Sequence, residues 1–72
     1  MELKLGRYRH FKGKMYIVLG IARHSETQEE FVIYRQDYGD RGLLVSPTQM
    51  FLDSVAFEGK KVPRFQFIQG QK

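Results

Sequence analysis

The apolar positions of this chain are densest between Met15 and His24. Both alternating faces of the stretch are apolar, and several of its residues are β-branched, which favours strand over helix. This pattern predicts a strand that is buried on both faces or curved inside a barrel. The small residues Gly20 and Ala22 would let the strand bend or a neighbour approach closely. We therefore expect a larger side chain at Gly20 to crowd the adjacent strand.

Shorter apolar segments flank this stretch and are separated by polar turns. Further strands are predicted over residues 6–11, 31–36, 43–45, 55–57 and 62–68. The polar segment 25–30 predicts a hairpin loop or a single helical turn. In the turn 38–42, Gly39 would supply a positive φ and Asp40 would bond a backbone N–H. Closely spaced turns in so short a chain predict an all-β fold, a small antiparallel barrel.

One helix is predicted, over Pro47–Leu52. Ser46 and Gln49 have the spacing of a capping box, and Pro47 would take the first helical position. This helix would place Met50 and Phe51 near the core. Later in the chain, Pro63 cannot donate to a ladder, so the segment 62–68 should lie at a sheet edge or a bulge.

The bulk composition limits the classes of protein to consider. A chain of 72 residues is expected to form a single domain over 1–72, with its core at about 6–68. Without Cys it has no disulfide and no thiolate chemistry. No secretory leader is visible, and the apolar run Met15–Ala22 is too short to span a bilayer. These features predict a cytoplasmic protein without membrane association.

The net charge of +4 is unevenly distributed. Residues 1–23 carry net +5, residues 24–58 carry net −5, and residues 59–72 carry net +4. If the two ends of the chain meet, as the first and last strands of a barrel do, Arg7, Arg9, Lys12, Lys60 and Arg64 would share a basic face. Such a face suits phosphate or another anion. The alternative is ordinary solvated charge on a small domain.

Two runs of residues are distinctive: Tyr-Arg-His-Phe-Lys-Gly at 8–13 and His-Ser-Glu-Thr at 24–27. With further matching positions from about Gly6 to Phe65, the chain resembles a family of short bacterial proteins catalogued as domain of unknown function 1653. The resemblance implies an SH3-like β-barrel and carries no activity. Two positions depart from the family pattern, since Leu44 replaces its usual Trp and Ser46 its usual Arg. If that Trp and Arg bind a ligand, this chain binds differently or not at all.

Catalytic and metal chemistry have weak signals in this sequence. Ser25 follows His24, but neighbours on a strand point to opposite faces, which works against a Ser–His hydrogen bond. A minor enzyme or metal-dependent hydrolase using His24, Ser25 and Glu26 remains the alternative function. His10 and His24 with Glu26 or Asp40 lack the spacing of a metal site. We therefore expect no cofactor and no metal.

The leading hypothesis is a small non-catalytic binding or adaptor module. Small barrels often bind nucleic-acid single strands or peptides by stacking them on exposed aromatic rings beside Arg. Phe11, Phe31 and Phe65 are expected to fill the core. The candidate binding face comprises Tyr8, Arg9, His10, His24, Glu26, Tyr38, Asp40 and Arg64. Its partner would be a protein segment or a single-stranded nucleic acid, and the protein would be a monomer or a weak homodimer joined along 62–68.

Overall fold

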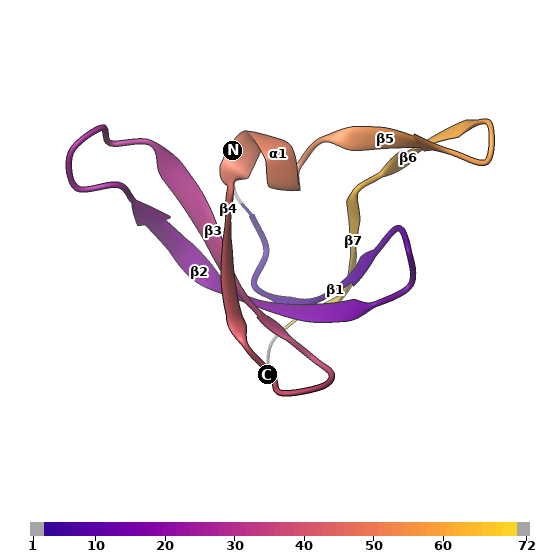
Figure 1. The fold of residues 1–72 in the computed structure, drawn as a ribbon, viewed down its shortest axis with the longest axis horizontal. Helices are drawn as coiled ribbons and strands as arrows, with labels where there is room; N and C mark the ends of the chain where they lie inside the picture. Colours follow the sequence, from indigo (N-terminus) through magenta and orange to yellow (C-terminus); the bar gives the residue numbers. More distant parts are fainter. Residues whose placement is uncertain (1–2, 71–72) are drawn as a thin grey trace.

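A computed structural model describes residues 3–70 and consists of antiparallel strands with one short helix (Figure 1). Five strands form one sheet in the order β4-β3-β2-β1-β7. They are β1 (Gly6–His10), β2 (Met15–Arg23), β3 (Glu30–Gln36), β4 (Leu43–Pro47) and β7 (Phe65–Gly70). Between β4 and β7 lie helix α1 (Thr48–Phe51) and a hairpin of β5 (Ser54–Phe57) and β6 (Lys60–Pro63). The predicted all-β class with one short helix is confirmed.

The barrel is not closed by a continuous ladder. Within residues 3–70, the β5–β6 hairpin is a separate two-stranded sheet. The segment 62–68, predicted as one strand, divides at Arg64, and β7 pairs with β1 instead. Arg64 is held by a different set of backbone bonds: its N–H donates to the Asp53 carbonyl (2.9 Å), and its carbonyl accepts from the Phe11 N–H (3.0 Å). The first and last strands along the chain, β1 and β7, are therefore neighbours in the sheet, as expected for a barrel.

The core lies on one face of the curved five-stranded sheet. Its buried residues are Tyr8, Val18, Val32, Tyr34 and Phe51. The Tyr8 hydroxyl donates to the Lys4 carbonyl (2.6 Å), and the hydroxyls of Tyr34 and Ser46 share a hydrogen bond (2.8 Å). The hydroxyls of the two buried tyrosines therefore have the partners that burial demands.

Of the three phenylalanines expected in the core, one packs against it and two lie outside it. Phe65 packs against the core and stacks on Phe51, with ring centroids 4.1 Å apart and planes 8° apart. Phe11 and Phe31 are half-buried and lie outside the core cluster, so the prediction is wrong for them. Tyrosines take the central positions because the fold supplies acceptors or donors for their hydroxyls.

Strand β2 is buried on only one face, so the first of the two predicted alternatives, burial on both faces, is wrong. Val18 is fully buried, while Leu19 is 38% exposed on a bulge between the pairs Val18–Tyr34 and Gly20–Ile33. A Cβ placed on Gly20 would meet nothing within 4 Å, so the expected crowding is also wrong. The single-sided core is the reason, because the opposite face of β2 has no layer packed upon it.

Local details around α1 also differ from the predicted ones. The N-cap is Pro47 and makes no side-chain cap hydrogen bond, because the Ser46 hydroxyl is bonded to Tyr34 rather than to the helix. Phe51 is buried as expected, but Met50 is 52% exposed.

The turn that follows β3 matches the prediction. Gly39 has φ 58°, and the Asp40 carboxylate accepts from the Gly42 N–H (3.2 Å). Arg41, for which no positive φ was predicted, also has one in this turn (57°). The local sequence therefore predicts the positive φ of Gly39 and the hydrogen bond of Asp40, but not the backbone conformation of Arg41.

Candidate functional site

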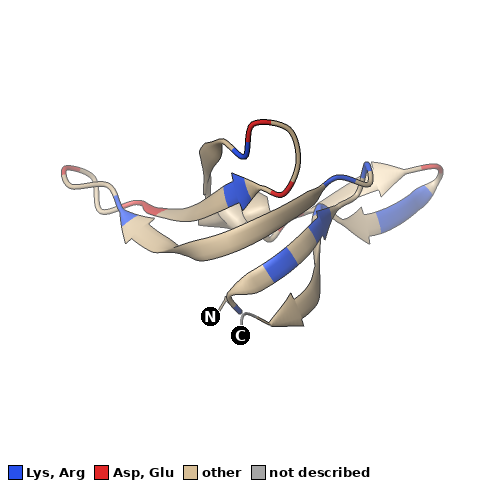
Figure 2. Ribbon diagram, turned by 90° about the horizontal axis from the view of Figure 1, so that it is seen from below, with Lys and Arg blue, Asp and Glu red and all other residues tan. Residues whose placement is uncertain are grey.

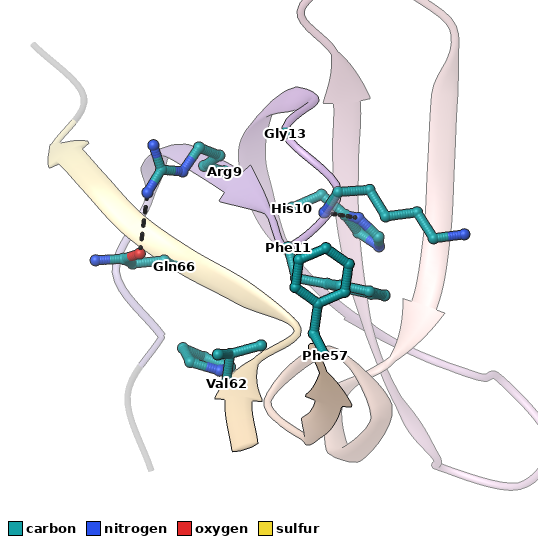
Figure 3. A pocket seen from close by; sticks show the side chains of 9 residues that line it. Arg9, His10, Phe11, Gly13, Phe57, Val62 and Gln66 are labelled. Carbon is teal, nitrogen blue, oxygen red and sulfur yellow. Dashed lines mark hydrogen bonds between the residues drawn. The ribbon is translucent and has the colours of Figure 1, made fainter. Parts of the chain in front are cut away.

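An open pocket of about 350 Å³ lies where the β1–β2 turn meets the β5–β6 hairpin and β7 (Figure 3). It is lined by Arg9, His10, Phe11, Lys12, Gly13, Phe57, Val62, Pro63 and Gln66. These residues come from two regions that are distant in sequence, 9–13 and 57–66. The pocket is therefore a product of the tertiary fold.

Hydrogen bonds within the β1–β2 turn hold the first wall of the pocket. The backbone N–H of Lys12 donates to Nδ1 of His10 (3.1 Å), and the N–H of Gly13 donates to the His10 carbonyl (2.7 Å). Gly13 has φ 104°, a conformation that favours glycine. The turn thus fixes the His10 ring and presents Phe11 and Lys12 to the pocket.

Two phenylalanine rings form the aromatic wall. Phe11 and Phe57 meet edge to face, with centroids 5.4 Å apart (Figure 3). The His10 ring lies 4.5 Å from Phe11 with an interplanar angle of 32°. Phe57 is 38% exposed despite its size. Exposed ring faces beside a pocket are suited to stacking on a planar group.

The electrostatic environment of the pocket is positive. Arg9 and Lys12 line it, whereas none of its lining residues is Asp or Glu. Lys60 and Lys61 lie on the adjoining strand β6, and Figure 2 shows basic residues on both the β1–β2 turn and the β5–β6 hairpin. Burial lowers the pKa of His10, and the positive charges of Lys12 and Arg64 lower it further. The site therefore favours an anion over a cation.

A tyrosine network lies next to this turn. The hydroxyls of Tyr16 and Tyr38 are 2.7 Å apart, and the Gln36 side chain donates to the Tyr38 hydroxyl (3.2 Å). Burial and the hydrogen bond with Tyr38 raise the pKa of Tyr16 to about 12. Tyr16 also meets the His10 ring at 6.2 Å. The network braces the wall that carries His10.

The structure places Arg9 and His10 in this pocket and the other residues of the predicted face elsewhere. Tyr8 is 5% exposed and belongs to the core, so it presents no ring to a ligand. Tyr38 is engaged with Tyr16, and Asp40 with the backbone of its own turn. The remaining three, His24, Glu26 and Arg64, do not line the pocket. The eight residues therefore do not form one face.

Sequence reasoning missed the contribution of the β5–β6 hairpin. Phe57, Val62 and Pro63 line the pocket, but only the packing of the hairpin against the β1–β2 turn brings them there. The available signal was a large ring, Phe57, immediately before the turn Glu58–Gly59. Such a ring at a hairpin tip needs either a packing partner or a ligand.

His24 serves the β2–β3 loop. Its Nδ1 accepts hydrogen bonds from the backbone N–H groups of Glu26 (3.1 Å) and Thr27 (3.3 Å). The imidazole is thus used as a loop cap, and its ring lies 6.4 Å from Phe31. This geometry gives Ser25 no activating base at Nδ1.

Across residues 3–70, no three His, Asp or Glu side chains gather closely enough to hold a metal ion. The same part of the chain has no helix with the length and hydropathy needed to cross a membrane.

Fold and pocket together describe a small all-β domain with a basic, aromatic-lined depression. A family model described as "Protein of unknown function (DUF1653)" matches residues 6–67, and the chain belongs to this family. It is similar to the crystal structure of a DUF1653 protein from Bordetella bronchiseptica, with 30% identity and a TM-score of 0.88. That match covers 99% of this chain and 94% of the other. No curated protein matches.

Proposed function

We propose that the protein is a non-catalytic binding module that takes single-stranded nucleic acid at the pocket between the β1–β2 turn and the β5–β6 hairpin. The observation that carries this proposal is the exposed ring of Phe57, packed on the half-buried Phe11, beside a pocket lining that contains Arg and Lys and no Asp or Glu. Phe57 and Phe11 supply ring faces and edges, and Arg9 and Lys12 supply positive charge. Nucleic-acid strands are recognised by this combination of stacking and phosphate attraction.

The shape of the pocket supports a strand rather than a duplex. A volume of about 350 Å³ accommodates a single base or a small planar group, and the pocket is open on one side. A base stacked on Phe57 would leave its phosphates near Lys12 and near the lysines of β6. Specificity for sequence is not expected, because every base presents a π-face to a ring.

The test is a fluorescence-anisotropy titration of labelled single-stranded DNA and RNA oligonucleotides at low and at physiological salt. Binding should be detectable at tens of micromolar protein in low salt, and it should weaken steeply as salt rises because bound phosphates release counterions. Phe57→Ala should cost about 1–3 kcal/mol of binding free energy if a base stacks there. Lys12→Ala should weaken binding and reduce the salt slope by about one unit.

Arg23→Ala is the matched control. Arg23 is an exposed basic residue at the other end of β2, next to the His24 loop and away from the pocket. Its removal subtracts the same charge and should leave the affinity nearly unchanged. Equal losses for Arg23→Ala and Lys12→Ala would indicate diffuse charge attraction without a site. Absence of binding in low salt would remove the proposal.

A protein segment as the ligand of this pocket would give a different result. Its affinity would depend weakly on salt and strongly on one or two aromatic anchors. Failure of the oligonucleotides to bind would leave that reading open for a separate test with peptides.

A further inference from the structure

The face of the sheet opposite the core carries an exposed apolar surface. Tyr34 and Val18 point into the core, so their neighbours along the strands point outward. We call the resulting surface the outer apolar face; it comprises Ile17, Leu19, Ile33, Leu43 and Val45 on strands β2, β3 and β4. Leu43 is 67% exposed and Val45 is 62% exposed. Exposed apolar side chains gathered on one face of a sheet are a feature of interaction sites.

The edge strand β4 has no charged residue along its length. Natural edge strands usually carry charge or a bulge that prevents pairing with another chain. Pro47 at its end is the one residue that limits pairing here. The outer apolar face and its edge are therefore open to a partner.

Two arginines lie in the same rows as the apolar residues. The register places Arg35 between Leu43 and Ile17, and Arg7 opposite Ile17. A pocket of about 330 Å³ opens here and is lined by Gly6, Arg7, Ile17, Leu19, Arg35, Gln69 and Gly70. The outer apolar face therefore borders a depression that is lined by two guanidinium groups.

The two arginines differ in what they already bind. Arg7 forms an ion pair with Asp37 (3.2 Å), and Arg41 pairs with the same carboxylate (3.0 Å). Arg35 forms no ion pair with any acid among residues 3–70. Its Nε is buried and has no hydrogen-bond partner there. Arg35 nevertheless lines the depression, and its guanidinium, which has no acidic partner there, would form a charge-assisted bond with a carboxylate entering it.

We propose that the outer apolar face docks a protein segment in which a carboxylate is flanked by apolar side chains. The carboxylate binds at Arg35, and the apolar side chains cover Leu43 and Val45. A second copy docked through the same face fits less well, because the outer apolar face carries no acid and the adjacent Asp37 is already shared by Arg7 and Arg41. A nucleic acid would leave the apolar side chains uncovered. The complement to one guanidinium amid aliphatic surface is an acidic, apolar peptide.

The probe is a library of short random peptides displayed on phage, selected on the intact protein. Selected peptides should share an Asp or Glu with aliphatic or aromatic residues on both sides. Changing that acid to its amide in a synthetic copy should weaken binding about tenfold, the effect of one charge-assisted hydrogen bond. Selection that yields no binders, or binders without a common acid, overturns the proposal.

Three variants locate the binding. Arg35→Gln and Leu43→Asp should each weaken the selected peptide about tenfold or more, while Met50→Asp, at an exposed apolar position on α1, should not. In Arg35→Gln the acid-to-amide change in the peptide should have little further effect, because the two groups form one interaction.

Two measurements separate misfolding and self-association from the proposed binding. Circular dichroism and thermal melting confirm that each variant is folded; if Arg35→Gln is not, Leu43→Asp and the amide peptide decide. Sedimentation equilibrium tests for a dimer, and a dimer that Leu43→Asp abolishes overturns the proposal. The oligonucleotide experiment tests residues on the other pocket, so either proposal can fail while the other stands.

Discussion

The two histidines of this chain lie in turns with the same local hydrogen bond and very different surroundings. In each, Nδ1 accepts from the backbone N–H two residues further on, at 3.1 Å. The His10 ring is packed by Phe11 at 4.5 Å and Phe65 at 5.0 Å. The residues from 21 to 30 around His24 are all exposed. Local sequence therefore gives both turns their form, and tertiary packing makes a pocket beside only one of them.

The largest expected difference between the surroundings of His10 and those of His24 is in how much they contribute to the free energy of unfolding. Phe51 is 1% exposed and stacks on Phe65, which in turn meets the His10 ring. Phe51→Ala should lower the free energy of unfolding by about 3–5 kcal/mol, through lost burial and a cavity. Phe31→Ala, at the half-buried ring nearest His24, should cost about 1 kcal/mol. Urea denaturation measures both.

Equal losses of unfolding free energy in these two variants would show that the surroundings of His10 and His24 are packed alike, which would contradict the comparison. A domain of this size has little stability to spare, so Phe51→Ala could prevent folding altogether. Phe51→Leu, which leaves a smaller cavity, then provides the measurable value.

The next effect concerns the tyrosine network beside His10. Because the pKa of Tyr16 is raised to about 12, its neutral form is favoured in the folded state. The associated stability is present below about pH 10 and is lost as pH rises through about 12. Burial also raises the pKa of Tyr8, so an alkaline absorbance titration should show delayed ionisation from more than one tyrosine, and Tyr16→Phe should remove the part that belongs to Tyr16.

Tyr16→Phe should also cost about 0.5–1.5 kcal/mol, the value of the lost hydrogen bond with Tyr38. The titration is the sharper measurement of the two. Four tyrosines that ionise together near pH 10 would contradict the buried network.

A smaller effect should appear in the acid dependence of stability. Burial, together with the charges of Lys12 and Arg64, lowers the pKa of His10 in the folded protein. The unfolded chain therefore binds this proton more readily, and stability is lost as pH falls from about 6.5 through the lower folded pKa. His10→Gln should reduce the drop in melting temperature over this range. A drop of the same size as in the wild type would contradict the assignment.

The smallest effect belongs to His24. His24→Ala removes the acceptor for the N–H groups of Glu26 and Thr27 and should cost less than about 1 kcal/mol, since this loop is exposed. Amide hydrogen exchange should accelerate at Glu26 and Thr27 and stay unchanged at Lys12. Slow exchange at those two amides in the variant would show that the loop does not rely on the imidazole.

Much of the strand pattern was predictable from the sequence, and the sidedness of the sheet was not. Period-two alternation and turn residues placed β1, β2, β3 and the turn at Gly39 and Asp40, because these depend on neighbouring residues. The apolar residues on both faces of β2 predicted two-sided burial. Only the fold reveals that Val18 is covered and Leu19 is exposed.

The candidate site divides in the same way. Arg9 and His10 were foreseeable because charge, ring and turn lie within a few residues of each other. Phe57 and Gln66 were not, because they reach the pocket through contacts between segments more than forty residues apart in the sequence. The strands, the turns and the basic character of both ends of the chain follow from backbone preferences and charge along the sequence. The tertiary structure alone decided which rings and charges share a pocket and which apolar face stays exposed, since both depend on long-range packing.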